Sequence, residues 1–131
     1  MRFLLDTHVA LWAVIEPERL PPTVREAIAD EANMVAVSVV TLWEIAIKHR
    51  LRRGARGDMT LSAAEAAHEF AAASFEFLDV TIDHALAVAG LPTIHGDPFD
   101  RMLIAQAKSE PMRLVTHDAL VASYGDWIER I

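Results

Sequence analysis

The chain has 131 residues, of which 53% are hydrophobic and 24% are charged, and its formal net charge is −7. This length and apolar content are those of one domain that spans residues 1–131. The absence of cysteine excludes disulfide bonds, cysteine-ligated zinc and iron–sulfur clusters. No apolar run approaches the roughly 18 residues of a membrane span, and neither end resembles a signal. We therefore expect a cytoplasmic protein that has no membrane partner.

Short apolar strands and helices alternate along the chain. In order, we predict a strand at residues 2–5, a turn at 6–8, helices at 9–13 and 23–31, a strand at 34–38, helices at 40–51 and 61–73, a strand at 75–80, a helix at 82–89, a loop at 93–98, a helix at 99–108, a strand at 113–115 and a brief helix at 120–121. Residues 127–131 form either an edge strand or a tail. Strand 34–38 is apolar without alternation, which is typical of a parallel strand covered on both faces. The pattern predicts an α/β fold with three α/β/α layers and a short, mostly parallel central sheet.

Four carboxylates stand within or beside apolar segments, where an unpaired charge is unfavourable. They are Asp6, Glu44, Asp100 and Asp118. A carboxylate that leaves water without a partner destabilises the fold or becomes protonated. One divalent cation compensates several acids at once, and ligands that offer only oxygen suit Mg²⁺ or Mn²⁺ better than zinc. The acids therefore predict a magnesium or manganese site.

Asp6 and Asp118 each follow a predicted parallel strand. The carboxyl ends of parallel strands meet at one edge of a sheet, where open α/β sheets bind their ligands. This shared position favours a common site for the two acids. The alternative for each is a helix N-cap, because Asp is among the best capping residues and a helix follows both positions.

Glu44 and Asp100 also have local alternatives. Thr41 and Glu44 have the spacing of a capping box, but the apolar neighbours of Glu44 favour an enclosed site. Asp97 and Asp100 both stand at the start of a helix, where negative charge is favourable. We expect Asp97 to be the cap and Asp100 to face the site. Arg101 is expected to pair with one of these acids or with a substrate phosphate.

Five of the 12 basic residues gather within nine positions of the sequence. They form what we call the basic segment: Lys48, Arg50, Arg52, Arg53 and Arg56. Clustered cations of this kind bind nucleic-acid phosphates, although a net charge of −7 is unusual for such proteins. The alternative is a solvated helix end whose cations interact favourably with the helix dipole.

The histidines and large aromatic residues carry a weaker signal. His8, His95 and His117 lie near the acids, but no histidine pair has the i, i+4 spacing of a helical zinc site. We treat them as neighbours of the site. Trp12, Trp43 and Phe99 are expected to lie in the core rather than to stack on nucleobases.

The four acidic segments together resemble the PIN-domain ribonucleases, and most closely the VapC-type toxins of bacterial toxin–antitoxin pairs. The matching stretches run from Phe3 to Trp12, Ser38 to Lys48, Asp97 to Ala107 and Leu114 to Asp118. The resemblance implies an α/β/α fold, Mg²⁺- or Mn²⁺-dependent cleavage of RNA, a homodimer and inhibition by a cognate antitoxin. Residues Tyr124 to Trp127 depart from the more apolar final strand of the family.

The resemblance also implies roles for individual residues. The catalytic and metal-binding acids of the family correspond to Asp6, Glu44, Asp100 and Asp118, and Asp97 is a possible further neighbour. Thr116 corresponds to the small hydroxyl residue that supports the site. Under this interpretation Asp6 and Asp100 bind the ion, while Glu44 and Asp118 bind a second ion or orient water molecules. The basic segment, through Lys48, Arg50, Arg52 and Arg53, would bind the RNA backbone.

Two functions from other classes remain as alternatives. A phosphatase of the haloacid-dehalogenase type would need a second Asp two residues after Asp6, where this chain has His8. A non-catalytic interaction module with the same fold would be expected to have lost one or more of the four acids, and all four are present.

Overall fold

A five-stranded, entirely parallel sheet forms the centre of the computed structural model, which describes residues 1–131. The strand order is β3-β2-β1-β4-β5. The strands are β1 (Arg2–Leu5), β2 (Met34–Ser38), β3 (Glu76–Leu78), β4 (Arg113–Thr116) and β5 (Ile128–Arg130). The helices are α1 (Thr7–Ile15), the 3₁₀ helix η1 (Pro17–Arg19), α2 (Pro22–Ala29), α3 (Val39–Arg50), α4 (Ala63–Ala72), α5 (Ile82–Ala89), α6 (Pro98–Ser109) and α7 (Ala119–Ala122).

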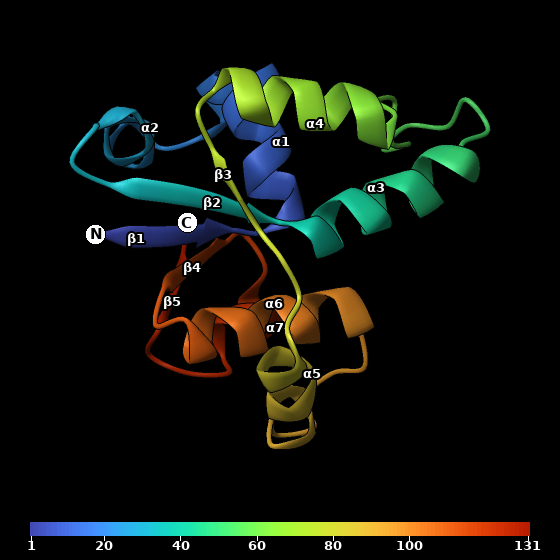
Figure 1. Ribbon diagram of the computed structural model, residues 1–131. Coiled ribbons are helices and arrows are strands. Elements are labelled where there is room, and N and C mark those ends of the chain that lie inside the picture. Colours follow the sequence, from blue (N-terminus) through green and yellow to red (C-terminus); the bar gives the residue numbers. More distant parts are fainter.

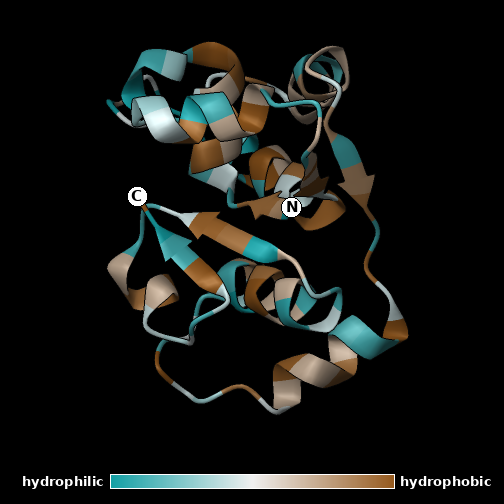
Figure 2. Ribbon diagram, turned by 90° about the vertical axis from the view of Figure 1, so that its left-hand side faces the viewer, coloured by the Kyte–Doolittle hydropathy of each residue, from teal (hydrophilic) through white to brown (hydrophobic).

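Helices cover both faces of this sheet, so the predicted three-layer architecture is confirmed. Helices α1, α2 and α4 lie on one side of the strands, and α5, α6 and α7 lie on the other (Figure 1). Hydrophobic residues follow the central strands between the two helical layers (Figure 2). The segment that contains β3 carries the chain from one layer to the other (Figure 1). None of the helices is both long enough and apolar enough to span a membrane.

Alternate residues of the inner strands fill two separate cores. Phe3 and Leu5 of β1 face the core beneath α1 and α4, whereas Leu4 faces the core beneath α6. Each of these three side chains is at most 7% exposed. Burial on both faces explains why the strands read as continuous apolar runs.

The register places the carboxyl ends of three neighbouring strands side by side. Leu5 pairs with Val37 of β2 and with Val115 of β4. The chain builds the sheet outward from β1 through β2 and β3, and then returns to add β4 on the other side of β1. This reversal beside β1 is the position at which open parallel sheets form ligand sites.

Most predicted elements are confirmed, with small differences at their ends. Helix α1 begins at Thr7 rather than at residue 9, because the Asp6 side chain caps it and residues 7–8 join its first turn. Helix α4 begins at Ala63, after a capping box formed by Ser62 and Glu65. Strand β3 covers only three of the residues expected at 75–80. Residues Ile128–Arg130 pair with β4, so the end of the chain is an edge strand.

Candidate active site

Asp6 ends β1 and is both a helix cap and a buried acid. Its Oδ1 accepts a hydrogen bond from the backbone N–H of Val9 at 2.9 Å, and its Oδ2 accepts one from the Thr116 hydroxyl at 2.5 Å. The residue is 8% exposed. Burial raises the pKa of Asp6 above its ordinary value of 3.8, although the hydrogen bonds from Thr116 and Val9 and the charge of His8 oppose this rise. Asp6 is therefore the helix cap that the sequence offered as an alternative, and its place in a common site with the other acids stays a prediction.

Thr116 joins Asp6 to Asp118 at the end of β4. Its hydroxyl donates to Asp6 and accepts a hydrogen bond from the backbone N–H of Asp118 at 3.0 Å. Asp118 itself caps α7, with its Oδ1 accepting from the N–H of Leu120 at 2.7 Å. The side chain of Asp118 is exposed, so the expectation that all four acids lie in enclosed surroundings is wrong for this one.

Glu44 lies in the second turn of α3 and is 4% exposed. Its Oε1 accepts a hydrogen bond from the Thr7 hydroxyl at 2.6 Å, and its Oε2 accepts one from the Lys48 ammonium at 2.6 Å. The capping-box alternative is wrong, because α3 begins at Val39 and is capped by Ser38. Glu44 is thus an enclosed acid in the helix interior, as its apolar neighbours indicated.

Asp97 and Asp100 differ in their contacts, and the expectation that Asp97 is the helix cap is confirmed. Asp97 caps α6 and accepts a hydrogen bond from the N–H of Asp100 at 2.9 Å. The Asp100 carboxylate instead contacts the imidazole of His95, with 3.1 Å between Oδ2 and Nε2. Burial raises the pKa of Asp100 most, the His95 hydrogen bond opposes it, and the negative charges of Asp97 and Glu44 raise it further. Helix α3 packs against α6, which brings the negative charge of Glu44 near Asp100.

A hydrogen-bonded group behind Asp100 was not expected from the sequence. His95 Nδ1 lies 2.7 Å from the hydroxyl of Tyr124, and Arg101 donates to the same hydroxyl at 3.0 Å. Arg101 also donates to the carbonyl of Pro92 at 2.8 Å and forms no salt bridge. The expectation that Arg101 pairs with a neighbouring acid is therefore wrong. The one signal that could have suggested Tyr124 is the unusual polarity of residues 124–127.

Aromatic side chains surround the site on two sides. Trp12 contacts His117 edge-to-face at a ring distance of 5.2 Å and lies 6.1 Å from His8. On the other side Trp43 packs edge-to-face on Phe99 at 5.2 Å. Trp12 and Phe99 pack against the core as expected, but Trp43 is 62% exposed, so its core assignment is wrong. Trp43 and Phe99 line a groove of about 600 Å³ between α3, α5 and α6.

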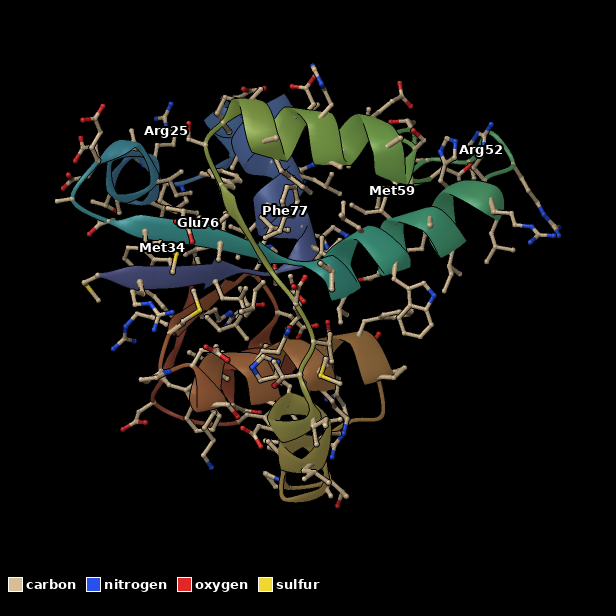
Figure 3. The ribbon with its side chains drawn as sticks, viewed as in Figure 1. Arg25, Met34, Arg52, Met59, Glu76 and Phe77 are labelled. Atoms are coloured by element: carbon tan, nitrogen blue, oxygen red, sulfur yellow. The ribbon has the colours of Figure 1, made fainter.

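The basic segment begins on α3 and continues into the loop that follows it. Arg50, Arg52 and Arg53 are exposed, whereas Lys48 is paired with Glu44. Figure 3 shows Arg52 at the far end of α3, on the opposite side of the molecule from Arg25 of α2. The cations of the last turn also suit the negative end of the helix dipole. The exposed arginines can thus be reached by a phosphate group, and RNA binding by the basic segment stays a prediction.

The comparison with known families decides the classification. Residues 3–125 match the family profile of the PIN domain. The chain belongs to the PIN-domain family. It is 32% identical over 122 residues to "Ribonuclease VapC22" of Mycobacterium tuberculosis, which covers 92% of this chain and 90% of that relative.

Solved structures agree with this PIN-domain assignment at the level of the fold. VapBC2 from Rickettsia felis, bound to a DNA fragment from its promoter, has a TM-score of 0.72 and 16% identity, with 99% of this chain and 98% of that chain covered. DNA-bound VapBC from Salmonella typhimurium has a TM-score of 0.69 and 19% identity, with the same coverage.

The acids of this PIN domain suit a hard divalent cation by their chemistry. Asp6 and Asp100 are carboxylates whose pKa is raised by burial, and neither contacts a lysine or an arginine. Carboxylate oxygens are the ligands that Mg²⁺ and Mn²⁺ prefer, and Mg²⁺ retains several waters, so one or two carboxylates suffice. No group of three His, Asp or Glu side chains converges on one point in this conformation. A cation held here would therefore have few protein ligands.

Proposed function

We propose that this PIN domain is a metal-dependent endoribonuclease and the toxin of a toxin–antitoxin pair. The observation that carries the proposal concerns Asp6 and Asp100. Burial disfavours the charged form of both carboxylates, and neither forms a salt bridge with a lysine or an arginine. The 32% identity to a relative named as a ribonuclease supports the reaction class. RNA would be the substrate.

Asp6 and Asp100 would hold Mg²⁺ or Mn²⁺, with Glu44 and Asp118 orienting water molecules or binding a second ion. When bound, the cation supplies Lewis acidity toward a scissile phosphate and lowers the pKa of a water molecule. Asp97 contributes by capping α6, which fixes the backbone that carries Asp100.

The surrounding residues hold these carboxylates in place. The Thr116 hydroxyl fixes one oxygen of Asp6, and the N–H of Val9 fixes the other. His95 fixes an oxygen of Asp100 and is itself held by Tyr124. The exposed cations Arg50, Arg52 and Arg53 would bind RNA phosphates and position the backbone, because such contacts orient nucleic acid without reading its sequence.

A cognate antitoxin and a second copy of the chain are the partners we propose. The similar structures from Rickettsia felis and Salmonella typhimurium are VapBC complexes, which supports an antitoxin for this chain. The groove beside Trp43 and Phe99 offers that partner an apolar surface next to Asp100. Ile82 and Leu86 of α5 are 79% and 68% exposed, which supports a homodimer through this helix. We place the protein in the cytoplasm.

The function is tested by incubating the purified full-length protein with total RNA in Mg²⁺, in Mn²⁺ and in EDTA. We expect RNA fragments with either metal and none in EDTA, and loss of cleavage in Asp6→Asn. Arg25→Ala, on the far side of the molecule, serves as the control and should cleave normally. A protein that binds its antitoxin but cleaves no RNA would be an interaction module. Hydrolysis of a small phosphate monoester without RNA cleavage would indicate a phosphatase.

A further inference from the structure

The enclosed acids of the site differ in whether the chain already gives them a positive charge. Asp6 takes part in no salt bridge, and Asp100 contacts only the imidazole of His95. Glu44, in contrast, has the ammonium of Lys48 at 2.6 Å. The chain therefore supplies a compensating ammonium to Glu44, whereas no lysine or arginine compensates the charge of Asp6 or Asp100.

The pair of Glu44 and Lys48 is positioned by the helix. The two residues are four apart on α3 with the acid nearer the N-terminus, which is the favourable order for an ion pair on one helical face. The side chain of Glu44 is 5% exposed and that of Lys48 is 46% exposed. By comparison, both side chains of the 3.5 Å pair Arg19–Glu16 are about half exposed. The partly exposed Lys48 side chain thus pairs its ammonium with an enclosed carboxylate.

Both oxygens of Glu44 are occupied at short distance. Thr7 donates to Oε1 and Lys48 to Oε2, each at 2.6 Å. A divalent ion that bound Oε2 would have to displace the ammonium or lie beside it, and like charges in a poorly solvated place repel strongly. Lys48 and His8, two residues beyond Asp6, also line one hollow of about 220 Å³. Lys48 therefore stands on the side of α3 that faces the site.

We propose that Lys48 is the second cation of this site, so that the protein binds one divalent ion, at Asp6 and Asp100, and the Lys48 ammonium takes the place of a second ion at Glu44. This inference rests on the proposed function. Lys48 is in this sense a positioning residue: its ammonium keeps the Glu44 carboxylate oriented and prevents a second ion from binding there. It belongs to the basic segment in sequence but acts apart from its exposed arginines.

The test is the stoichiometry of Mn²⁺ binding to the metal-free, full-length protein, measured by the paramagnetic resonance of free Mn²⁺ and by calorimetry. We expect the wild-type protein, Lys48→Arg and the control Arg25→Met to bind one ion per chain. Lys48→Met keeps the aliphatic stem but removes the charge, and we expect it to bind two. Adding Glu44→Gln to Lys48→Met should return the number to one.

Glu44→Gln alone provides a second, independent variant, and thermal unfolding of each variant verifies that it is folded. We expect Glu44→Gln to bind one Mn²⁺ with an affinity within a few-fold of the wild type, whereas Asp6→Asn binds none. Two ions in the wild-type protein, or one ion of unchanged affinity in Lys48→Met, would overturn the role of Lys48 and leave the proposed function standing. A wild-type protein that binds no Mn²⁺ would instead reject the metal-dependent function itself, and the one-ion site with it.

Discussion

The hydroxyl of Thr116 donates a hydrogen bond to Oδ2 of Asp6, which lies 110 residues earlier in the chain. The same oxygen of Thr116 accepts the N–H of Asp118. One fully buried side chain therefore fixes the carboxylate at the end of β1 and the backbone at the end of β4. This contact is possible because the two strands are parallel neighbours in the sheet.

Replacing Thr116 with Val should impair activity and stability together. Valine has nearly the same shape but leaves the N–H of Asp118 and one oxygen of Asp6 without a partner, at a cost of about 1–3 kcal/mol. A lost supporting contact of this kind typically lowers metal affinity or activity roughly 10- to 100-fold. RNA cleavage rates and urea unfolding measure the two effects. Thr116→Ser retains the hydroxyl and should stay close to the wild type; equal damage in both variants would show that the methyl group matters instead.

Asp6→Asn and Asp100→Asn should each abolish metal binding and RNA cleavage while the protein stays folded. Both substitutions remove a ligand, and both also remove a carboxylate whose charged form burial disfavours. Calorimetry with Mn²⁺ and a fluorescent RNA substrate provide the measurements. Full activity in either variant would remove that residue from the proposed site.

The pH dependence of stability should differ between Asp6→Asn and the wild type in EDTA. The pKa of Asp6 is raised by burial in the folded state, so the unfolded chain loses its proton first as the pH rises. Ionisation of Asp6 therefore lowers the stability of the wild type between the ordinary value of 3.8 and the higher folded pKa, and Asp6→Asn lacks this contribution. Melting temperatures measured from acid to neutral pH should show that Asp6→Asn becomes more stable relative to the wild type as the pH rises above about 4. A variant that is more stable than the wild type only below about pH 4 would contradict a raised pKa of Asp6 in the folded state.

The exposed arginines of the basic segment should act on RNA binding rather than on the chemical step. Replacing Arg50, Arg52 and Arg53 with Ala removes phosphate contacts, so we expect a higher KM, a flatter salt dependence and a nearly unchanged kcat. Steady-state kinetics at several salt concentrations measure this. Arg50→Ala compared with Arg25→Ala provides a matched pair of exposed helical arginines, and an identical salt slope in the two would favour the helix-dipole interpretation.

Leu86→Asp should convert the proposed homodimer to a monomer. Leu86 is 68% exposed on α5, so a charge there costs little in the isolated chain but would be unfavourable in an apolar interface. Light scattering coupled to gel filtration reports the mass. Ile15→Asp, at a position 48% exposed on α1, is the control and should not change the mass. A wild-type protein that is already monomeric at high concentration would reject the dimer.

Local features of the chain were predictable because they depend on neighbouring residues. Strand Met34–Ser38 and helix Ile82–Ala89 have the predicted bounds, and Asp97 caps α6 as expected. Capping, apolar periodicity and turn residues act within about one helical turn, so they can be read from the sequence. The edge shared by Asp6 and Asp118 also followed from the rule for parallel strands.

Only the tertiary structure decided which groups meet the acids. Thr7 contacts Glu44 from another helix, and His95 contacts Asp100 while Tyr124 holds the imidazole. It also decided that Trp43 is exposed and that Arg101 binds a hydroxyl and backbone carbonyls rather than a carboxylate. These outcomes depend on the packing of helices that are far apart in the chain. Side-chain direction and solvent access at such contacts are set by the neighbouring element, which the local sequence does not contain.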